Sequence, residues 1–430
     1  MMELIHSVKH KTFASLKIRN YRLYFLGQAI SVAGTWMHTV ALGWFVLQLT
    51  SSGTQLGAVV ATTFVPLLVF GPLGGVIADR FPKHKVIMYV QSAFVVLALL
   101  LSALVYSGLT QVWMLYVFAF LYGLLRSVDE PTRQAFVLEM VDESRMKNAV
   151  SLNSMVNNLA RAIGPMIGGM LIVNVGIAFC FLFNALSYIA VIWMFLIMDK
   201  NELRRQKPAS EGSQGVMDGF RFILATPLIK NTLLMMAIVG TFAYEWQVSL
   251  PLLAQRTFHG DATSYAALMS SFGVGAVIGG LYAASRHTLS SRHLVLWVLL
   301  FGLSIIATSV MPSLLLTMLG MVTVGFFSIN LTSTANTMVQ LESTPEMRGR
   351  VMSFWTVAMM GSTAIGGPAV GLVGEYVGAR FGLLLGGVSA LVAAGIAAFP
   401  LLKKNFVDVI PASGDIEEDA LPAFTKRRTR

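Results

Sequence analysis

The stretch Gly71–Lys85, GPLGGVIADRFPKHK, decides the fold, because an apolar run stops within it and a basic cluster begins. The residues leading into it, 54–78, carry no charge and are long enough to cross a bilayer as a helix. Basic residues follow directly from Arg80 onward, as expected of a loop on the cytoplasmic side of a membrane. This junction therefore predicts a membrane helix that ends at the cytoplasmic surface.

Apolar runs of similar length recur along all 430 residues, of which 55% are hydrophobic and 12% charged. A water-soluble protein typically carries about 25% charged residues, so the composition argues strongly against a soluble fold. The lone cysteine, Cys180, excludes an internal disulfide. Twelve membrane-spanning helices are predicted, at 22–48, 54–78, 86–107, 112–130, 148–173, 177–198, 230–253, 262–285, 293–310, 312–337, 351–374 and 379–402.

Basic residues concentrate in alternate links between these spans. The N-terminal arm, the links after the second and fourth spans and the middle link are rich in Lys and Arg, whereas the opposite links hold only Arg256 and Arg380. The bias predicts that both termini and the middle link are cytoplasmic. The net charge of +10 therefore reports membrane topology and does not indicate a nucleic-acid partner.

One long polar connection divides the twelve spans into two sets of six. Part of it, VMDGFRFILATPLIK, has an apolar face and predicts a helix lying along the membrane surface. The polar tail is expected to be disordered. The predicted parts are a cytoplasmic arm at 1–21, an N-terminal half at 22–198, a cytoplasmic middle link at 199–229, a C-terminal half at 230–402 and a cytoplasmic tail at 403–430.

The two halves repeat each other weakly. AGTWMHTVALGWFVL (33–47) matches VGTFAYEWQVSLPLL (239–253), and GPMIGG (164–169) matches GPAVGL (367–372). Parallel repeats of this kind form transporters whose substrate site lies between the halves. Four spans also carry glycines four residues apart, which predicts either ordinary helix packing or a moving contact between the halves. These pairs are Gly71/Gly75, Gly164/Gly168, Gly275/Gly279 and Gly367/Gly371.

The opening stretch resembles the signature of the major facilitator superfamily, in which small and apolar residues precede Asp-Arg, a turn and basic residues. Pro82 replaces the second glycine of that pattern, and proline also serves turns. The matching residues are Gly75, Asp79, Arg80 and Lys83. The resemblance implies an all-α integral membrane protein whose twelve transmembrane helices form two pseudo-symmetric six-helix halves. A solvated charge cluster is the alternative interpretation.

The fifth span contains ARAIGPMIGG, which resembles the antiporter motif of the drug/proton antiporters. Ser151 and Ala160 stand where the motif has its first two glycines, and both are small. The matching residues are Gly164, Pro165, Gly168 and Gly169, and the corresponding residues of the second half are Gly367, Pro368 and Gly371. The proline removes a backbone donor and the glycines allow close helix contact.

Two further stretches, NYRLYFLGQAISVAGTWMHTVALGWFVLQLT (20–50) and DEPTRQAFVLEMV (129–141), look like the branch that holds enterobactin exporters and macrolide efflux proteins. The resemblance is good over 20–190 and thinner in the second half. It implies export of a small amphipathic, drug-like or siderophore-like molecule across the inner membrane by proton antiport and alternating access.

Three titratable or charged side chains lie deep within predicted spans, where a charge costs about 2.5 to 3.5 kcal/mol on insertion scales. Glu245 is the predicted proton carrier, or else a permanent salt-bridge partner of Arg161. Arg161 stays charged, so it is a counter-ion, a substrate anchor or a structural residue. His38 titrates near neutral pH and is either a second proton carrier or a packing residue.

Charged residues at the cytoplasmic ends of the spans are interpreted as gate latches. Asp79, Arg126, Asp129 and Arg133 belong to this group, and Arg126 is expected to pair with Asp129 three residues later. By family resemblance, spans one, four, seven and ten line the substrate cavity. The expected lining residues are Trp36, Tyr122, Phe242, Tyr244, Trp246, Phe326 and Asn330.

The sequence holds no nucleotide-binding loop, no Cys/His metal cluster and no set of catalytic groups. A monomeric transporter without cofactor or metal is expected, with substrate, protons and the lipid bilayer as its partners. Two alternatives remain open at this point. One is a siderophore or lysophospholipid facilitator without proton coupling, and the other is a membrane receptor that transports nothing.

Overall fold

The computed structural model describes residues 14–204, 216–286, 288–403 and 407–409, and those ranges contain twelve helices that are long and apolar enough to span a membrane. Each predicted span falls on one of them. The N-terminal half, or N half, comprises α2 (Arg19–Thr50), α3 (Gly53–Arg80), α4 (Lys83–Ser107), α5 (Val112–Met140), α6 (Glu143–Asn174) and α7 (Ile177–Leu196).

The C-terminal half, or C half, has six spans too, two of them interrupted. Its seventh span joins α9 (Pro227–Phe242), α10 (Trp246–Leu252) and the π-helical turn η3 (Leu253–Thr257). Its eleventh joins α14 (Pro345–Thr356), the π-helical turn η4 (Val357–Gly361) and α15 (Thr363–Tyr376). The uninterrupted spans are α11 (Ala262–Ser285), α12 (Ser291–Ser309), α13 (Leu314–Glu342) and α16 (Ala379–Lys403).

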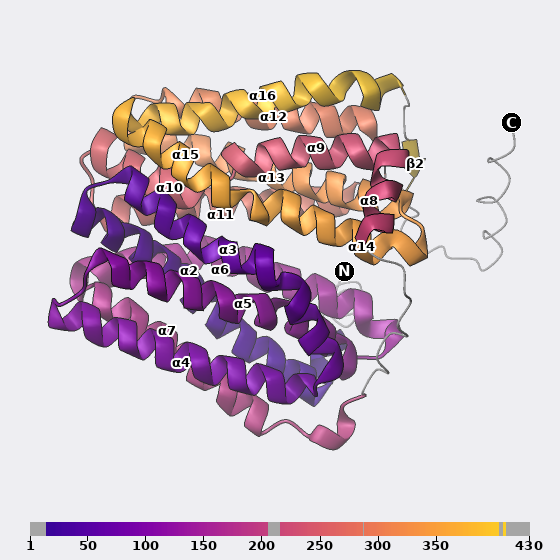
Figure 1. Ribbon diagram of the computed structural model, residues 1–430, viewed down its shortest axis with the longest axis horizontal. Coiled ribbons are helices and arrows are strands. Elements are labelled where there is room, and N and C mark those ends of the chain that lie inside the picture. The colour runs from indigo at the N-terminus through magenta and orange to yellow at the C-terminus, as the bar shows by residue number, and fades with distance from the viewer. Residues whose placement is uncertain (1–13, 205–215, 287, 404–406, 410–430) are drawn as a thin grey trace, which may run out of the picture.

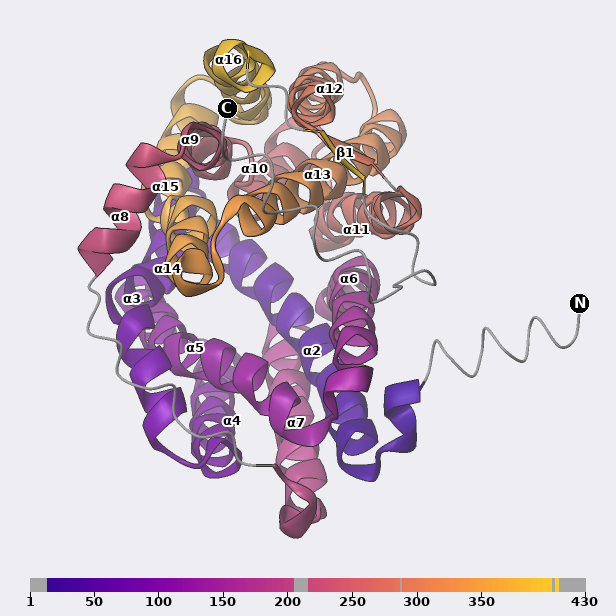
Figure 2. The same cartoon turned by 90° about the vertical axis from the view of Figure 1, so that its right-hand side faces the viewer.

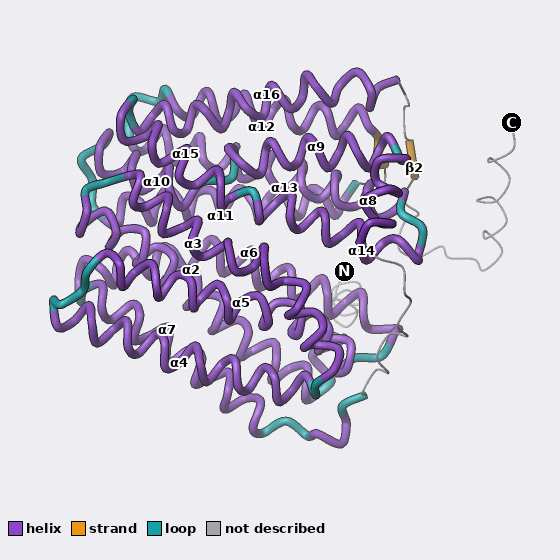
Figure 3. The backbone as a smooth tube through the Cα atoms, in the orientation of Figure 1, coloured by secondary structure: helices purple, strands orange, loops and turns teal. Residues whose placement is uncertain are grey.

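The two halves lie side by side as separate bundles (Figure 1), and short connections join the helices at both ends (Figure 3). Local sequence sets where helices start and stop. Ser52 accepts the Gln55 N–H at the start of α3, as a helix N-cap does. After α4, Gly108 adopts a φ of +70°, which is the left-handed conformation that glycine tolerates at a helix end.

The bundle has two distinct ends. We call the end with the turns at Ser51–Ser52, 108–111, 175–176, 258–261, 310–313 and 377–378 the far side, and the opposite end, which holds the middle link, the arm side. Figure 2 views the arm side, with the helices of the two halves facing each other across the middle of the molecule. The main contacts between the halves join α3 to α15 and α6 to α11.

The middle link is attached to both halves. Asn20 and Asp199 exchange two hydrogen bonds, of 2.8 and 3.0 Å, and the Arg204 N–H donates to the Glu139 carbonyl of α5 at 2.9 Å. The surface helix α8 (Val216–Ala225) packs against α14 of the C half. Its apolar residues Met217, Phe220 and Leu224 are exposed, as expected for a helix at a membrane surface.

Two short 3-10 turns, η1 (Ala14–Lys17) and η2 (Lys200–Glu202), and a two-stranded sheet complete the arm side. Strand β2 (Val407–Val409) pairs antiparallel with β1 (Thr288–Ser290), directly before α12. Disorder was expected throughout 403–430, so this strand is a correction at its three residues, which include two β-branched valines and pair with β1. The arm before residue 14 and the remaining tail lie outside the described residues.

Candidate substrate and proton site

The seventh span breaks in the middle of the membrane, at Ala243–Glu245. Glu245 has φ −83° and ψ 44°, and its carbonyl accepts the N–H groups of Val248 and Ser249, which starts α10. Pro251 lacks a backbone donor, so the carbonyl four residues earlier has no intrahelical partner. Interrupted membrane helices line the ion and substrate sites of transporters, which draws attention to the side chains at this break.

Glu245 is 2% exposed and turns toward α15 of its own half. A Cβ added at Gly366 would lie 2.9 Å from Oε1, and one added at Gly367 would lie 3.6 Å from Oε2, so the carboxyl rests against the glycine backbone. Thr363 is its hydrogen-bonding neighbour, yet the buried Oε1 atom has no partner. Burying an unpaired charge is costly, so this position suits a carboxyl that exchanges a proton.

Arg161 lies on α6 of the N half, at the contact between the halves. Its guanidinium stacks over the Trp36 ring of α2, 5.2 Å from the ring centroid. The buried Nε atom has no acceptor, and no ion pair joins Arg161 to Glu245 within the described chain. The predicted salt-bridge alternative for Glu245 is therefore wrong, because similar depth in two helices does not set the direction of their side chains.

Tyr244 and Glu245 are consecutive, and they face different neighbours. The Tyr244 hydroxyl lies 2.8 Å from Ser328 Oγ of α13, and this hydroxyl is close enough to Arg161 of the N half to interact with it electrostatically. Trp36 and Tyr244 are thus the two expected lining residues that flank Arg161, one from each half. The unwound backbone at Ala243–Glu245 allows this divergence.

His38 lies inside the N half. It is 6% exposed, stacks on Tyr122 with ring centroids 5.0 Å apart and meets Phe181 edge-on. Its Nδ1 atom is buried without a partner, and the side chain borders a small cavity that Asn184 and Tyr188 also line. This environment fits the packing role, which was the alternative expectation for His38. A role of His38 in proton transfer stays a prediction.

The side-chain contacts described for four of the other five expected lining residues are with residues of their own half. Tyr122 is 9% exposed under His38, Trp246 packs with Phe272 and Phe301, and Asn330 bonds the Phe326 and Gly279 carbonyls. These three residues are buried, and Tyr122 borders the small cavity beside His38. Their place in a substrate path stays a prediction. The remaining two, Phe242 and Phe326, are half-buried. The backbone of Phe242 lies against Gly386 of α16, and the Phe326 ring packs on Tyr282.

The expected gate residues of the opening stretch separate from one another. Asp79 and Arg80 are exposed at the end of α3, and a Cβ at Gly75 would meet no heavy atom within 4 Å. Lys83 is 8% exposed and forms a 2.9 Å ion pair with Glu139, which sequence reasoning missed. The motif therefore ties α4 to α5 within the N half, and its gating role stays a prediction.

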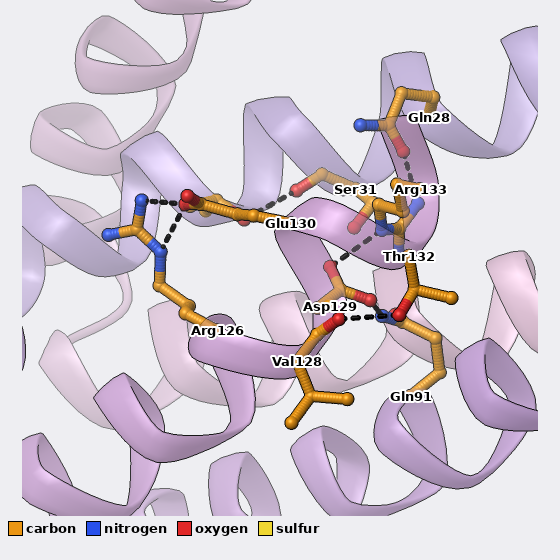
Figure 4. A network of polar contacts seen from close by, with 10 residues as sticks. Gln28, Ser31, Gln91, Arg126, Val128, Asp129, Glu130, Thr132 and Arg133 are labelled. Carbon is orange, nitrogen blue, oxygen red and sulfur yellow. Dashed lines mark hydrogen bonds and ion pairs between the residues drawn. The ribbon is translucent and has the colours of Figure 1, made fainter. Parts of the chain in front are cut away.

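Figure 4 shows the polar network at the arm-side part of α5. Arg126 pairs with Glu130, and Arg133 pairs with Asp129 at 2.6 Å. Arg133 also donates to Gln28 of α2, and Gln91 of α4 donates to Asp129 at 3.1 Å. The expected pairing of Arg126 with Asp129 is wrong, because each arginine takes the carboxylate four residues away on the same helical face. Both pairs lie within the N half.

Glycine backbones make the contact between the halves. Gly57 on α3 abuts the Gly367 carbonyl, and Gly53 lies against Gly371, with 2.8 Å between an added Cβ and that carbonyl. Gly169 meets α11, where an added Cβ would lie 3.1 Å from the Ala262 carbonyl. The four helices of the predicted moving contact are those that touch, namely spans two, five, eight and eleven.

Most glycines of the predicted stripes nevertheless face other neighbours. Gly164 and Gly168 pack on α2 at Trp36 and Met37, within the N half, and Pro165 lies inside the unbroken α6. The Gly275/Gly279 pair packs on α13, and Gly71/Gly75 meets nothing within 4 Å. Of the four predicted pairs, only Gly367/Gly371, beside Pro368, contacts the opposite half. The prediction of a contact between the halves is wrong for the glycines of the other three pairs.

A polar cluster that sequence reasoning missed joins the halves on the far side. Glu375 Oε2 on α15 accepts the Ser52 hydroxyl and the Thr54 N–H, each at 2.7 Å. Arg256 of η3 donates to the Glu375 carbonyl at 3.0 Å and to the Ser51 carbonyl at 2.6 Å. We call these five residues the far-side latch, because Ser51, Ser52 and Thr54 belong to the N half and the other two to the C half.

Comparison with known proteins supports this architecture. A family model described as transmembrane secretion effector matches residues 10–427. The enterobactin exporter EntS of Shigella flexneri is 27% identical over 389 residues, covering 86% of this chain and 90% of that protein. The staphyloferrin A transporter of Staphylococcus aureus is 25% identical over 338 residues, covering 77% and 84%, respectively.

Solved structures share the fold at low identity. A bacterial homologue of the human lysosomal transporter Spinster, in an inward-facing and unoccupied conformation, has a TM-score of 0.70 and 15% identity, covering 91% of this chain and 98% of that one. The POT family transporter PepTSo has a TM-score of 0.72 and 15% identity, covering 90% and 98%. This multi-pass membrane protein belongs to the transmembrane secretion effector family of major facilitator superfamily transporters.

Proposed function

We propose that the protein exports a small amphipathic, siderophore-like molecule across the inner membrane by proton antiport, with Glu245 as the proton carrier. The names of the two similar transporters support the substrate class, since both refer to siderophores. The basic links support a cytoplasmic arm side and cytoplasmic termini. In that orientation the halves touch on the outer side of the membrane, and alternating access reverses this contact.

The observation that carries the proposal is the placement of Glu245. This carboxyl is 2% exposed at a helix break and rests on the backbone of α15. No cation among the described residues lies within ion-pair distance of it. Since α15 makes one of the two main contacts between the halves, a change of charge on Glu245 acts where the halves meet. Gain and loss of a proton at this residue thus couple directly to the movement of α15 against α3.

Uptake of enterobactin into everted membrane vesicles tests the proton carrier. In Glu245→Gln the amide mimics the neutral acid, so uptake driven by an imposed pH gradient is expected to fall to background. Counterflow without a gradient stays within about twofold of wild type. Glu202→Gln, the same change at an exposed acid of η2, serves as the control and leaves both activities unchanged.

The same assay separates the alternatives. Gradient-driven uptake by Glu245→Gln at the wild-type rate would refute the proton-carrier role. Wild-type uptake that ignores the imposed gradient would instead indicate a facilitator without proton coupling. Absence of uptake by the wild type under all gradients would point to a different substrate or to a receptor.

A further inference from the structure

Among the described residues, the guanidinium of Arg161 has no anionic partner. None of the ion pairs among the described residues includes it, and its buried Nε atom has no acceptor. Three other arginines at or near the spans are compensated, whereas Arg286, directly after α11, donates to Thr334 but also has buried nitrogen atoms without a partner among the described residues. Arg126 and Arg133 each bind a carboxylate, and Arg380 donates to the Ser309 and Met311 carbonyls at 2.8 and 2.7 Å. Arg161 is therefore a cation whose partner comes from elsewhere.

The surroundings of Arg161 leave the N–H groups at the edge of its guanidinium available to a ligand. Trp36 covers one face of the guanidinium plane, at 5.2 Å from the ring centroid. A cation–π contact of this kind orients the group and leaves its N–H donors unused. Glu245, the acid of the broken seventh span, turns to α15, and no carboxylate among the described residues forms an ion pair with Arg161. Tyr244, held by Ser328, brings a hydroxyl toward the same place from the C half.

A guanidinium at membrane depth is costly unless an oxyanion satisfies it, and its planar fork binds a carboxylate in a bidentate manner. We propose that Arg161 binds an anionic oxygen group, a carboxylate or a catecholate, of the transported molecule. The substrate is accordingly an organic acid that enters as an anion and completes the charge balance between the halves. This inference rests on the proposed transport function for the identity of the ligand as substrate, and its test needs no transport.

The position of the site explains how one substrate engages both halves. Arg161 and Trp36 belong to the N half, whereas Tyr244 belongs to the broken seventh span of the C half. A bound anion therefore touches the residue directly before Glu245. Substrate and proton therefore bind on opposite sides of the unwound segment Ala243–Glu245. The substrate binds on the side toward α6, and the proton binds Glu245 on the side toward α15.

Binding to the purified protein in nanodiscs tests the site with two matched probes, 2-hydroxybenzoate and its neutral amide, 2-hydroxybenzamide. We expect the wild type to bind the carboxylate at least tenfold more tightly than the amide. Arg161→Gln should lose that preference, with carboxylate affinity lowered tenfold or more and amide affinity little changed. Arg221→Gln, on the exposed surface of α8, is the control and retains the preference.

Equal affinity of the wild type for the two probes, or no detectable binding of the carboxylate, would overturn the proposal. Retention of the preference by Arg161→Gln would do the same. If Arg161→Gln does not fold, Arg161→Lys keeps the charge but loses the bidentate fork, and at least a threefold loss of carboxylate preference is then required. The measurement is repeated in Glu245→Gln, where anion binding should persist, so failure of the proton-carrier proposal leaves this result intact.

Discussion

The two ends of the bundle use polar groups in opposite ways. On the far side, Glu375 and Arg256 of the C half bind the N half, and glycine backbones meet beneath them. On the arm side, the ion pairs Lys83–Glu139 and Arg133–Asp129 lie within the N half alone. The hydrogen bonds described above that join the two halves lie on the far side. We predict that charge on the far side controls a conformational equilibrium and that charge on the arm side stabilises one half.

The largest expected effect comes from filling the glycine contact. In Gly367→Leu, the new Cβ would lie 2.9 Å from the Gly57 carbonyl, so the halves cannot close on the far side. Vesicle uptake of enterobactin should fall at least tenfold. The matched control is Gly71→Leu on α3, where an added Cβ meets nothing within 4 Å and uptake should persist. Equal activity of the two variants would contradict the assignment of this contact.

Breaking an arm-side ion pair should lower stability without moving the halves. Lys83→Met leaves Glu139, which is 5% exposed, without its cation, and loss of one partner of a buried pair costs about 3 to 5 kcal/mol. A lowered melting temperature in detergent is the expected result. Spin labels at the exposed residues Leu109 and Val310, on the far side of opposite halves, should report an unchanged distance. A longer distance would mean that this pair also acts on closure.

Removing the far-side latch should have the opposite effects: the Leu109–Val310 distance should change, and the melting temperature should change little. Glu375→Ala deletes the acceptor for Ser52 and Thr54 at the start of α3, an interaction of the kind worth about 0.5 to 2 kcal/mol. The Leu109–Val310 distance distribution should shift toward the longer, open population by about twofold to thirtyfold. The melting temperature should change less than in Lys83→Met. An unaltered distance distribution would remove the latch from the description of closure.

The smallest effect is expected from removing a helix-capping carboxylate whose hydrogen bonds lie within one half. Asp261 accepts the Thr263 and Ser264 N–H groups at the start of α11, and its hydrogen bond from the Thr263 hydroxyl is the main cause of its lowered pKa. Asp261→Ala should lower the melting temperature slightly near neutral pH and leave the Leu109–Val310 distance unchanged. Because the pKa is lowered in the folded state, this stabilisation is present at neutral pH and vanishes as the pH falls below about 4. A constant difference across pH would contradict it.

The sequence predicted the fold well because membrane spans have a strong local signal. Apolar length and basic links are properties of single segments, and the predicted spans all coincide with helices. Glu245 and Arg161 were found for the same reason, since a charge within an apolar run is conspicuous. The break at Ala243–Glu245 had no such signal, because Tyr244 and Glu245 suit a continuous helix equally well.

Neighbours across the molecule were harder to predict than the helices themselves. A pair of glycines four residues apart defines a face of a helix, but Gly164 turned out to face α2 and Gly367 to face α3. The far-side latch joins Arg256 and Glu375 to the turn between α2 and α3. These residues are remote from one another in sequence, and all lie at the ends of spans. Polar residues are common at span ends, so nothing in the sequence distinguishes these.

The middle link sets an upper limit on how far the protein can open. Arg204 is fixed to α5 by its N–H bond to Glu139, and Val216 begins the helix that packs on α14. The chain between these two anchors spans roughly 40 Å at full extension, at about 3.3 to 3.6 Å per residue. The middle link is thus a tether between the two halves. We predict that the length of this link limits how far the halves separate on the arm side, and that shortening it restricts this separation without altering any residue proposed for transport.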